Sequence, residues 1–305
     1  MLKKLAPFFV IVAASLWALD GIVLRPSLYT LPVTLVVFVE STIVAILLTP
    51  FMIKYISKVK ELSRADILAF IGVAIAGGAI GTMAITKALF YVNYVNLSIV
   101  ILIQKLQPVF AITLAAIFLK EKLPNIFFVW GGLAITGAYF MTFGFNLPNL
   151  ETGDKITLAA IFSLIAALGF GSSTVLSKRA LKDTSFELGT YLRFAISSII
   201  MLIIVISSDT LSSITLITTN QIYIFFLIAF TTGGPAIFLY YFGLKRISAS
   251  VASICELAFP LTAVILEFVL RSNILGPVQW IGAVILFLSI LRVTNIQING
   301  NNRVS

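Results

Sequence analysis

Apolar and polar residues follow one another along this chain in long blocks. Ten apolar runs, each of roughly 15 to 22 residues, are separated by short polar segments, and most are long enough to cross about 30 Å of hydrocarbon as a helix. The runs span residues 5–24, 32–53, 67–87, 97–118, 126–145, 156–177, 186–206, 221–242, 249–270 and 278–292. The first run follows two lysines as a signal peptide would, but no small-residue cleavage site comes after it, so we expect a retained helix. The pattern predicts an all-α integral membrane protein with ten transmembrane helices.

Positive residues are distributed unevenly between the segments that separate these runs. If the N-terminus is cytoplasmic, the inner segments collect Lys3, Lys4, Lys54, Lys58, Lys60, Arg64, Lys120, Lys122, Lys178, Arg179, Lys182, Lys245, Arg246, Arg292 and Arg303, out of 21 Lys and Arg in the chain. The outer segments keep Arg25, Lys155 and Arg271. Because cytoplasmic loops carry the excess of Lys and Arg, we expect a multi-pass protein of a bacterial-type plasma (inner) membrane with both termini in the cytoplasm.

The amino-acid composition limits the kinds of site and partner that this chain can have. The chain is 60% hydrophobic and 11% charged, with a mean hydropathy of +1.09, whereas soluble domains carry about 25% charged residues. There is no histidine and only one cysteine, Cys255, so neither a metal centre nor a cofactor is expected. The net charge of +9 follows helix ends and forms no basic patch, so we expect a lipid bilayer and not nucleic acid as the partner.

The two halves of the chain resemble one another with an offset of about 152 residues. Residues 14–23 align with 167–176, and residues 106–111 align with 258–263. Each half contains five predicted spans, an odd number, so the second half enters the membrane from the opposite side. The sequence therefore predicts two inverted five-helix repeats, residues 1–150 and 151–305, an architecture typical of carriers that work by alternating access.

Several short segments form a recognisable order along nearly the whole chain. They are Ala14-Ser15-Leu16-Trp17, Lys105-Leu106-Gln107-Pro108-Val109-Phe110, Phe118-Leu119-Lys120-Glu121-Lys122, Trp130-Gly131-Gly132 and, in the second half, Gln279-Trp280-Ile281-Gly282-Ala283. This order resembles the EamA-type family of the drug/metabolite transporter superfamily. The resemblance implies ten helices around a central cavity and the export or exchange of small organic solutes. Two positions depart from the repeat: Glu121 has Asn273 as its counterpart, and Glu40 has Arg193.

Charged residues within the apolar runs are functional candidates, because each costs roughly 3 kcal/mol or more in a bilayer unless it is paired or hydrated. They are Asp20, Glu40, Lys87, Lys105, Arg193 and Glu256. Lys87 is expected to reach the outer interface. Glu40 and Lys105 each lie about eight residues, roughly 12 Å, from the outer face. We therefore predict an ion pair between them and its repeat mate between Arg193 and Glu256, and these pairs either line a cavity or only hold helices together.

The fourth and ninth predicted spans offer the best substrate-binding site. A proline frees a backbone carbonyl one turn earlier, which membrane helices tolerate only beside protein or a hydrated cavity. Beside Pro108 and Pro260 lie Gln104, Lys105, Gln107 and Glu256; we expect Lys105 to bind a carboxylate and Glu256 an amine or a coupling proton. Packed kinks remain the alternative. Secondary candidates are Trp17, Asp20, Tyr91, Asn93, Tyr94, Asn96, Tyr240 and Tyr241. An aromatic belt explains Tyr91, Tyr94 and Tyr240 at least as well, and contact with water or Arg25 explains Asp20 equally well. Gly233 and Gly234 are predicted hinges or close contacts.

These features favour a secondary active transporter that exports or exchanges a small molecule, amino-acid-like or cationic and amphipathic. A channel-like facilitator is the first alternative. An intramembrane enzyme is disfavoured, because no histidine, paired Asp cluster or glycine-flanked serine with a base partner is present, and no Gly-Lys-Ser/Thr segment suggests ATP drive. Proton coupling and a homodimer are both compatible with the sequence.

Overall fold

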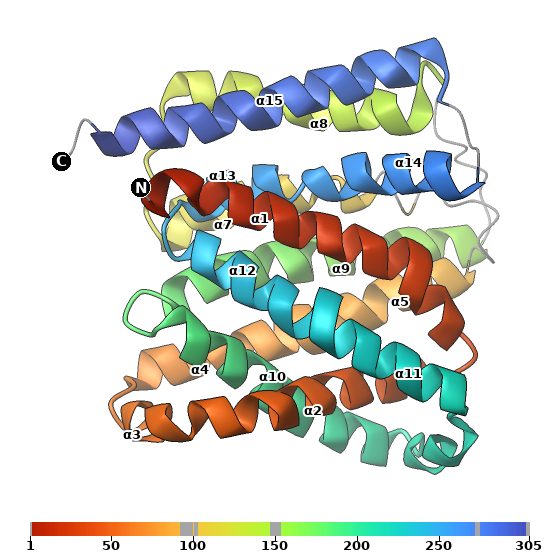
Figure 1. Ribbon diagram of the computed structural model, residues 1–305. Helices are drawn as coiled ribbons and strands as arrows, with labels where there is room; N and C mark the ends of the chain where they lie inside the picture. The colour runs from red at the N-terminus through yellow and green to blue at the C-terminus, as the bar shows by residue number, and fades with distance from the viewer. Residues whose placement is uncertain (1, 92–99, 101–102, 147–153, 272–274, 303–305) are drawn as a thin grey trace.

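The computed structural model is a bundle of long helices (Figure 1) and describes residues 2–91, 100, 103–146, 154–271 and 275–302. The first half contains α1 (Leu2–Leu19), η1 (Asp20–Leu24), η2 (Arg25–Leu28), α2 (Val33–Met52), η3 (Ile53–Tyr55), α3 (Ile56–Val59), α4 (Arg64–Val73), η4 (Ala74–Gly81), α5 (Thr82–Tyr91), α7 (Gln107–Phe118) and α8 (Asn125–Phe143). The second contains α9 (Asp154–Ala180), α10 (Phe186–Ser207), η5 (Leu211–Leu216), α11 (Thr219–Ile228), η6 (Ala229–Gly233), α12 (Gly234–Leu244), α13 (Ala249–Cys255), α14 (Ala258–Arg271) and α15 (Pro277–Asn302).

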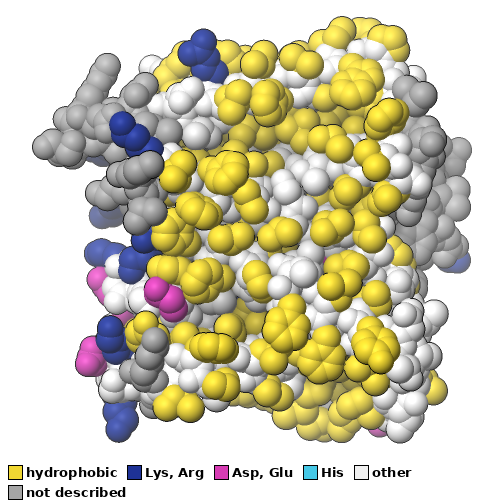
Figure 2. Space-filling view, viewed as in Figure 1, with side chains coloured by type: hydrophobic (Ala, Val, Ile, Leu, Met, Phe, Trp, Pro, Cys, Tyr) yellow, Lys and Arg dark blue, Asp and Glu magenta, His cyan; other side chains and the backbone are white. Residues whose placement is uncertain are grey.

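The bundle has the surface of a membrane protein. In the described part of the chain, nine helical segments are long and apolar enough to cross a bilayer, and α7 adds a shorter apolar helix. Hydrophobic side chains cover the flank of the bundle, while Lys and Arg gather at one edge (Figure 2). The chain begins and ends at that edge (Figure 1). The predicted fold is confirmed: the chain is an integral membrane protein of ten helices, built as two inverted five-helix repeats.

The two halves interlock. α8 packs along α15 and α2 packs along α10, so each of these contacts joins equivalent helices of the two repeats. The other long contacts come in matched pairs: α1 packs against α12 and α14, while α9 packs against α5 and α7. The first helix of each repeat therefore lies against the third and fourth spans of the opposite repeat. A rigid separation of residues 1–150 from 151–305 would break most of this apolar packing.

The third and eighth spans change helix type near their middle. In the third span, the π-helix η4 separates α4 from α5, and in the eighth, the π-helix η6 separates α11 from α12. Pro235 is the second residue of α12, directly after Gly233 and Gly234, and it has no backbone N–H with which to continue the helical hydrogen bonds of the preceding turn. Short π-helical segments occur preferentially at functional sites. Whether the two glycines act as hinges stays a prediction.

The fourth and ninth spans are broken by turns, where the sequence predicted continuous helices over 97–118 and 249–270. The chain turns at Lys105 in the fourth span, before α7, and at Glu256 in the ninth, between α13 and α14. Pro108 and Pro260 follow these turns within the first residues of α7 and α14. Residues 97–99 and 101–102 of the predicted fourth span lie outside the described residues. Both breaks place a charged residue within an otherwise apolar span.

Glycine brings α8 and α15 into backbone contact. A Cβ atom at Gly137 would lie 2.7 Å from the backbone nitrogen of Leu286, and one at Gly282 would overlap the backbone of Met141. At Gly132, also on α8, an added Cβ would meet open space. Its place on the helix explains this, because Gly132 and Gly137 lie on different faces of α8.

Candidate functional site

The carboxylate of Glu256 is the centre of a buried polar cluster. Gln107 donates from Nε2 to Oε2 over 2.8 Å, and the Tyr240 hydroxyl donates to Oε1 over 2.7 Å. The Thr174 hydroxyl lies 3.3 Å from Oε1 and 3.0 Å from the Tyr240 oxygen. We call these four residues the Glu256 cluster. Its carboxylate is held by three uncharged donors, and none of the ion pairs among the described residues includes it.

Four spans deliver the Glu256 cluster. Gln107 begins α7, Thr174 lies on α9, Tyr240 lies on α12, and Glu256 forms the turn between α13 and α14. Two of the four residues therefore lie at helix breaks, where unpaired backbone groups are tolerated beside polar surroundings. From α1, the Trp17 ring lies against the ring of Tyr240, with 5.2 Å between the centroids. A flat apolar surface thus adjoins the hydrogen-bonding groups.

The predicted ion pair between Arg193 and Glu256 is wrong. Nη1 of Arg193 donates instead to the hydroxyl of Tyr241 over 3.4 Å, and the guanidinium carbon lies 5.8 Å from that ring's centroid. The same hydroxyl lies 2.9 Å from the hydroxyl of Ser177. Tyr241 is fully buried. Arg193 and Glu256 are therefore engaged by adjacent tyrosines of α12, which point toward different partners.

The predicted ion pair between Glu40 and Lys105 is also wrong. Glu40 accepts a 3.2 Å hydrogen bond from Nη2 of Arg25, and Arg25 binds Asp20 through Nε at 2.8 Å and Nη2 at 2.5 Å. We call these three residues the Asp20–Arg25–Glu40 cluster. Of the two readings of Asp20, the structure shows pairing with Arg25. Glu40 does contact a basic side chain, but that side chain is Arg25, at the adjacent end of the first span, and not Lys105.

Gln104 and Lys105 are partly buried and form no hydrogen bond or ion pair with another described residue. Lys87 is exposed, with its amine 5.6 Å from the ring centroid of Phe162, in keeping with its expected place at the interface. Tyr91 stacks on the same ring, with centroids 5.7 Å apart. Three further candidates, Asn93, Tyr94 and Asn96, lie outside the described residues, as does Asn273. Substrate contact by any of these side chains stays a prediction.

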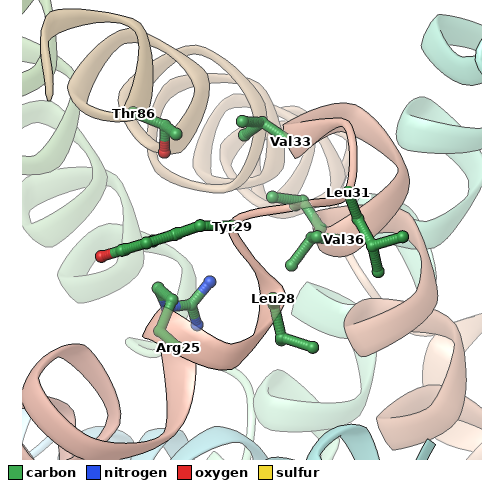
Figure 3. Close-up of a pocket in the computed structure, with 8 residues that line it drawn as sticks. Arg25, Leu28, Tyr29, Leu31, Val33, Val36 and Thr86 are labelled. Atoms are coloured by element: carbon green, nitrogen blue, oxygen red, sulfur yellow. The ribbon is translucent and has the colours of Figure 1, made fainter. Parts of the chain in front are cut away.

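Two pockets in the described part of the chain lie away from the Glu256 cluster. One, a cavity of about 20 Å³, lies between η2, α2 and α5 and has Arg25, Tyr29 and Thr86 as its polar residues (Figure 3). The other, of about 230 Å³, is an apolar recess between α14 and α15 beside Trp280. Neither is the central cavity that the family resemblance implies. In this conformation protein groups occupy the acceptor positions of Glu256.

Sequence reasoning missed Thr174 and Ser177 and assigned Tyr240 only a secondary role. The available signal was a run of hydroxyl residues, 172–174 and 177, within the apolar sixth span. Helical spacing places Thr174 and Ser177 on one face of α9, where each meets one of two consecutive tyrosines. Which helix would supply those tyrosines could not be read from spacing alone.

Inverted repeats, interrupted helices and polar side chains placed between them are the features from which solute carriers are built. The fold and the Glu256 cluster define a membrane transporter of small metabolites. The sequence profile of the EamA-like transporter family matches residues 4–143 and again residues 157–295, and the chain belongs to this family.

Two similarities extend over nearly the whole chain. The riboflavin transporter ImpX of Fusobacterium nucleatum subsp. nucleatum is 43% identical over 288 residues, which are 94% of this chain and 96% of that relative. A solved crystal structure superposes with a TM-score of 0.72 at 14% identity, covering 97% of this chain and 96% of the other. The second similarity concerns the fold alone. The family and the curated relative identify a transporter and not an enzyme.

Proposed function

We propose that this protein is a secondary carrier that moves riboflavin, or a closely related flavin, across the membrane by alternating access. The observation that carries the proposal is the 43% identity to a riboflavin transporter along almost the full length of both chains. The alignment covers 94% of this chain and 96% of the relative, so neither chain has a large segment that the other lacks. The carrier exports or exchanges its substrate, as the family resemblance implies.

The Glu256 cluster has the chemistry that such a substrate requires. Riboflavin joins a flat, uncharged tricyclic ring to a chain of hydroxyl groups. The carboxylate of Glu256 and the amide of Gln107 can hydrogen-bond hydroxyl or imide groups, while Trp17 and Tyr240 supply aromatic faces for ring stacking. A binding solute would replace the protein donors that now satisfy Glu256.

A cationic amphipathic solute is the second candidate, and a specific observation favours it. Glu256 is an acidic side chain within a membrane span that forms no ion pair among the described residues. A buried carboxylate of this kind attracts a positively charged group. The amino-acid-like substrate expected from sequence would also need an anchor for its carboxylate, and Lys105 is the basic residue nearest to the cluster along the chain.

The test is counterflow in proteoliposomes. Vesicles preloaded with unlabelled riboflavin should transiently accumulate labelled riboflavin above equilibrium, because a carrier exchanges one molecule for another while a channel only equilibrates them. Riboflavin should also raise the unfolding temperature of the purified protein, since a ligand that binds only the folded form stabilises it. Excess lysine or a hydrophobic amine should not compete. Saturable counterflow of an amine with none of riboflavin would replace the first candidate by the second.

We also infer that both termini lie in the cytoplasm. Lys and Arg side chains gather at the edge of the bundle that contains both ends of the chain (Figure 2). A single cysteine introduced by Asp209→Cys, in the exposed segment after α10, should then react with an impermeant maleimide added to whole cells. The native Cys255 is buried and gives little background. Labelling only after the membrane is permeabilised would reverse the orientation.

A further inference from the structure

The Asp20–Arg25–Glu40 cluster places two carboxylates around one guanidinium inside the first and second spans. The side chains of Asp20 and Glu40 are 11% and 14% exposed, and that of Arg25 is 28% exposed. One carboxylate oxygen of each acid, Asp20 Oδ1 and Glu40 Oε1, is buried and accepts no hydrogen bond, although the latter lies 3.2 Å from Nη2 of Arg25. The cluster therefore carries more acceptors than the protein satisfies.

The charges of the cluster do not balance. With both acids ionised, the net charge is −1 in a largely apolar setting, where an uncompensated charge is costly. Arg25 favours Asp20, to which it donates two hydrogen bonds of 2.8 and 2.5 Å, over Glu40, which receives one of 3.2 Å. The uncompensated negative charge thus belongs mainly to Glu40.

We propose that Glu40 is the proton-binding site through which this carrier couples transport to a pH gradient, with Arg25 and Asp20 as positioning residues. The inference rests on the proposed function in one respect, that a solute is carried. A proton suits the site better than a sodium ion, because a metal cation beside Glu40 would be repelled by the guanidinium 3.2 Å away, whereas a proton simply neutralises the carboxylate. This site is separate from the Glu256 cluster.

Few other charged groups face Glu40. Arg25 and Asp20 interact with it directly, and Tyr29 interacts electrostatically with both of them. Burial raises the pKa of Tyr29, so its phenol stays neutral at physiological pH and leaves the charge balance unchanged. α10 packs along α2, and its Ser198 contacts Thr42 of α2, close to Glu40. Arg193 lies more than one turn away from Ser198 on α10 and contacts Tyr241.

The remaining neighbours bring no competing charge. Tyr223 of α11 is 70% exposed, and Lys87 of α5 is exposed beside Phe162. α14 meets η1 through Phe259, whose ring lies 3.7 Å from a Cβ position at Gly21. The acidic and basic residues of α14, Glu267 and Arg271, lie two turns or more further along that helix. Glu187 and Tyr191, at the start of α10, and Lys54 and Tyr55, after α2, belong to the opposite end of the bundle.

A pocket of about 20 Å³, enough for about one water molecule, adjoins Arg25 of the cluster. Arg25 lines the pocket between η2, α2 and α5, and Figure 3 shows Tyr29 and Arg25 side by side on one wall of it. The Arg25–Glu40 contact joins the end of the first span to the second span. Protonation of Glu40 removes the charge that holds this contact and leaves Arg25 with Asp20. Proton binding therefore loosens a link between two spans, which is how a bound ion can bias a carrier's conformations.

The first measurement is independent of any solute. Infrared difference spectra of purified protein, recorded as the pH is lowered, should show a protonated-carboxyl band with a component that Glu40→Gln removes and Asp209→Asn retains. Asp209 is exposed in the segment after α10 and serves as the matched control. In proteoliposomes, Glu40→Gln should lose about tenfold of the riboflavin accumulation driven by a pH gradient, with counterflow within about twofold of wild type. Glu40→Asp should restore part of the coupling.

The outcomes separate the two proposals. Counterflow that is absent while the Glu40 band persists would reject the flavin substrate and leave the proton site standing. A band in Glu40→Gln that is unchanged from wild type, or gradient-driven accumulation by that variant at the wild-type level, would overturn the proton site. So would accumulation by the wild-type protein that follows a sodium gradient and ignores the pH gradient.

Discussion

The hydroxyl of Tyr240 donates a 2.7 Å hydrogen bond to the carboxylate of Glu256, and this contact joins α12 of the eighth span to the break in the ninth. Both spans are interrupted, one by a π-helix and one by a turn. A single hydrogen bond thus connects two segments that can change conformation without separating the interlocked repeats. Rearrangement of this contact is a physically economical way to open a site for solute.

We therefore expect Tyr240→Phe to weaken the site while keeping the ring against Trp17. The variant removes a donor to a carboxylate, a loss of about 1–2 kcal/mol in the free energy of unfolding. The unfolding temperature in detergent should fall, and riboflavin should stabilise the variant less than wild type. Tyr223→Phe, at a tyrosine of α11 that is 70% exposed, is the control. Equal unfolding temperatures for the two variants would contradict the assigned hydrogen bond.

A second prediction concerns Glu121, whose carboxylate caps α13. It accepts hydrogen bonds from the backbone nitrogens of Ala249 and Ser250, at 2.7 and 3.2 Å, and from the Ser250 hydroxyl at 2.6 Å. Replacing the charge by Glu121→Gln should weaken the cap and let α13 open more often. The single thiol, Cys255 at the end of α13, is fully buried.

The rate at which a maleimide modifies Cys255 measures this opening directly. A loss of about 1 kcal/mol corresponds to roughly a fivefold faster reaction, because the reactive state becomes more populated. Glu61→Gln, at an exposed acid near the same edge of the bundle, should leave the rate unchanged. An unaltered rate in Glu121→Gln would show that the cap does not restrain α13.

A third prediction tests the contact between α8 and α15. A methyl group at Gly282 would overlap the backbone of Met141, so Gly282→Ala must push two helices apart. Overpacking of this kind costs about 1–3 kcal/mol, and the unfolding temperature should fall accordingly. Gly132→Ala makes the same chemical change on α8 where the added methyl meets open space, and it should be neutral. A neutral Gly282→Ala would mean that the helices are less tightly apposed.

A fourth prediction compares two acids that share Arg179. Asp66 is buried and lies 2.8 Å from Nη1 of Arg179, whereas Asp183 lies 3.8 Å away and is 62% exposed. Asp66 also completes a capping box with Ser63 at the start of α4. Asp66→Asn should lower the free energy of unfolding by about 1–3 kcal/mol, and Asp183→Asn by less than about 1 kcal/mol. If the two variants lowered the unfolding temperature equally, the buried ion pair of Asp66 with Arg179 would contribute no more to stability than the exposed one of Asp183.

Much of the fold was accessible from sequence because a bilayer imposes strong one-dimensional rules. Apolar length predicts spans, Lys and Arg predict sidedness, and an odd number of spans in each repeat predicts inversion. Pro108 and Pro260 indicated where the fourth and ninth spans depart from regular helix. The offset of about 152 residues also aligned Gln104 and Lys105 with Glu256 and Leu257, which lie at the two helix breaks.

The partners of the buried charges were decided by the tertiary structure. Sequence spacing gives depth along a helix, yet each residue also turns by about 100° around the axis, and the neighbouring helix is unknown until the bundle is packed. Glu40 was therefore assigned to Lys105 at a similar depth, although η1 and η2 bring Arg25 to it first. Likewise Glu256 meets Thr174 and Tyr240 because α9 and α12 both reach the ninth span's break, a proximity that no spacing within one helix encodes.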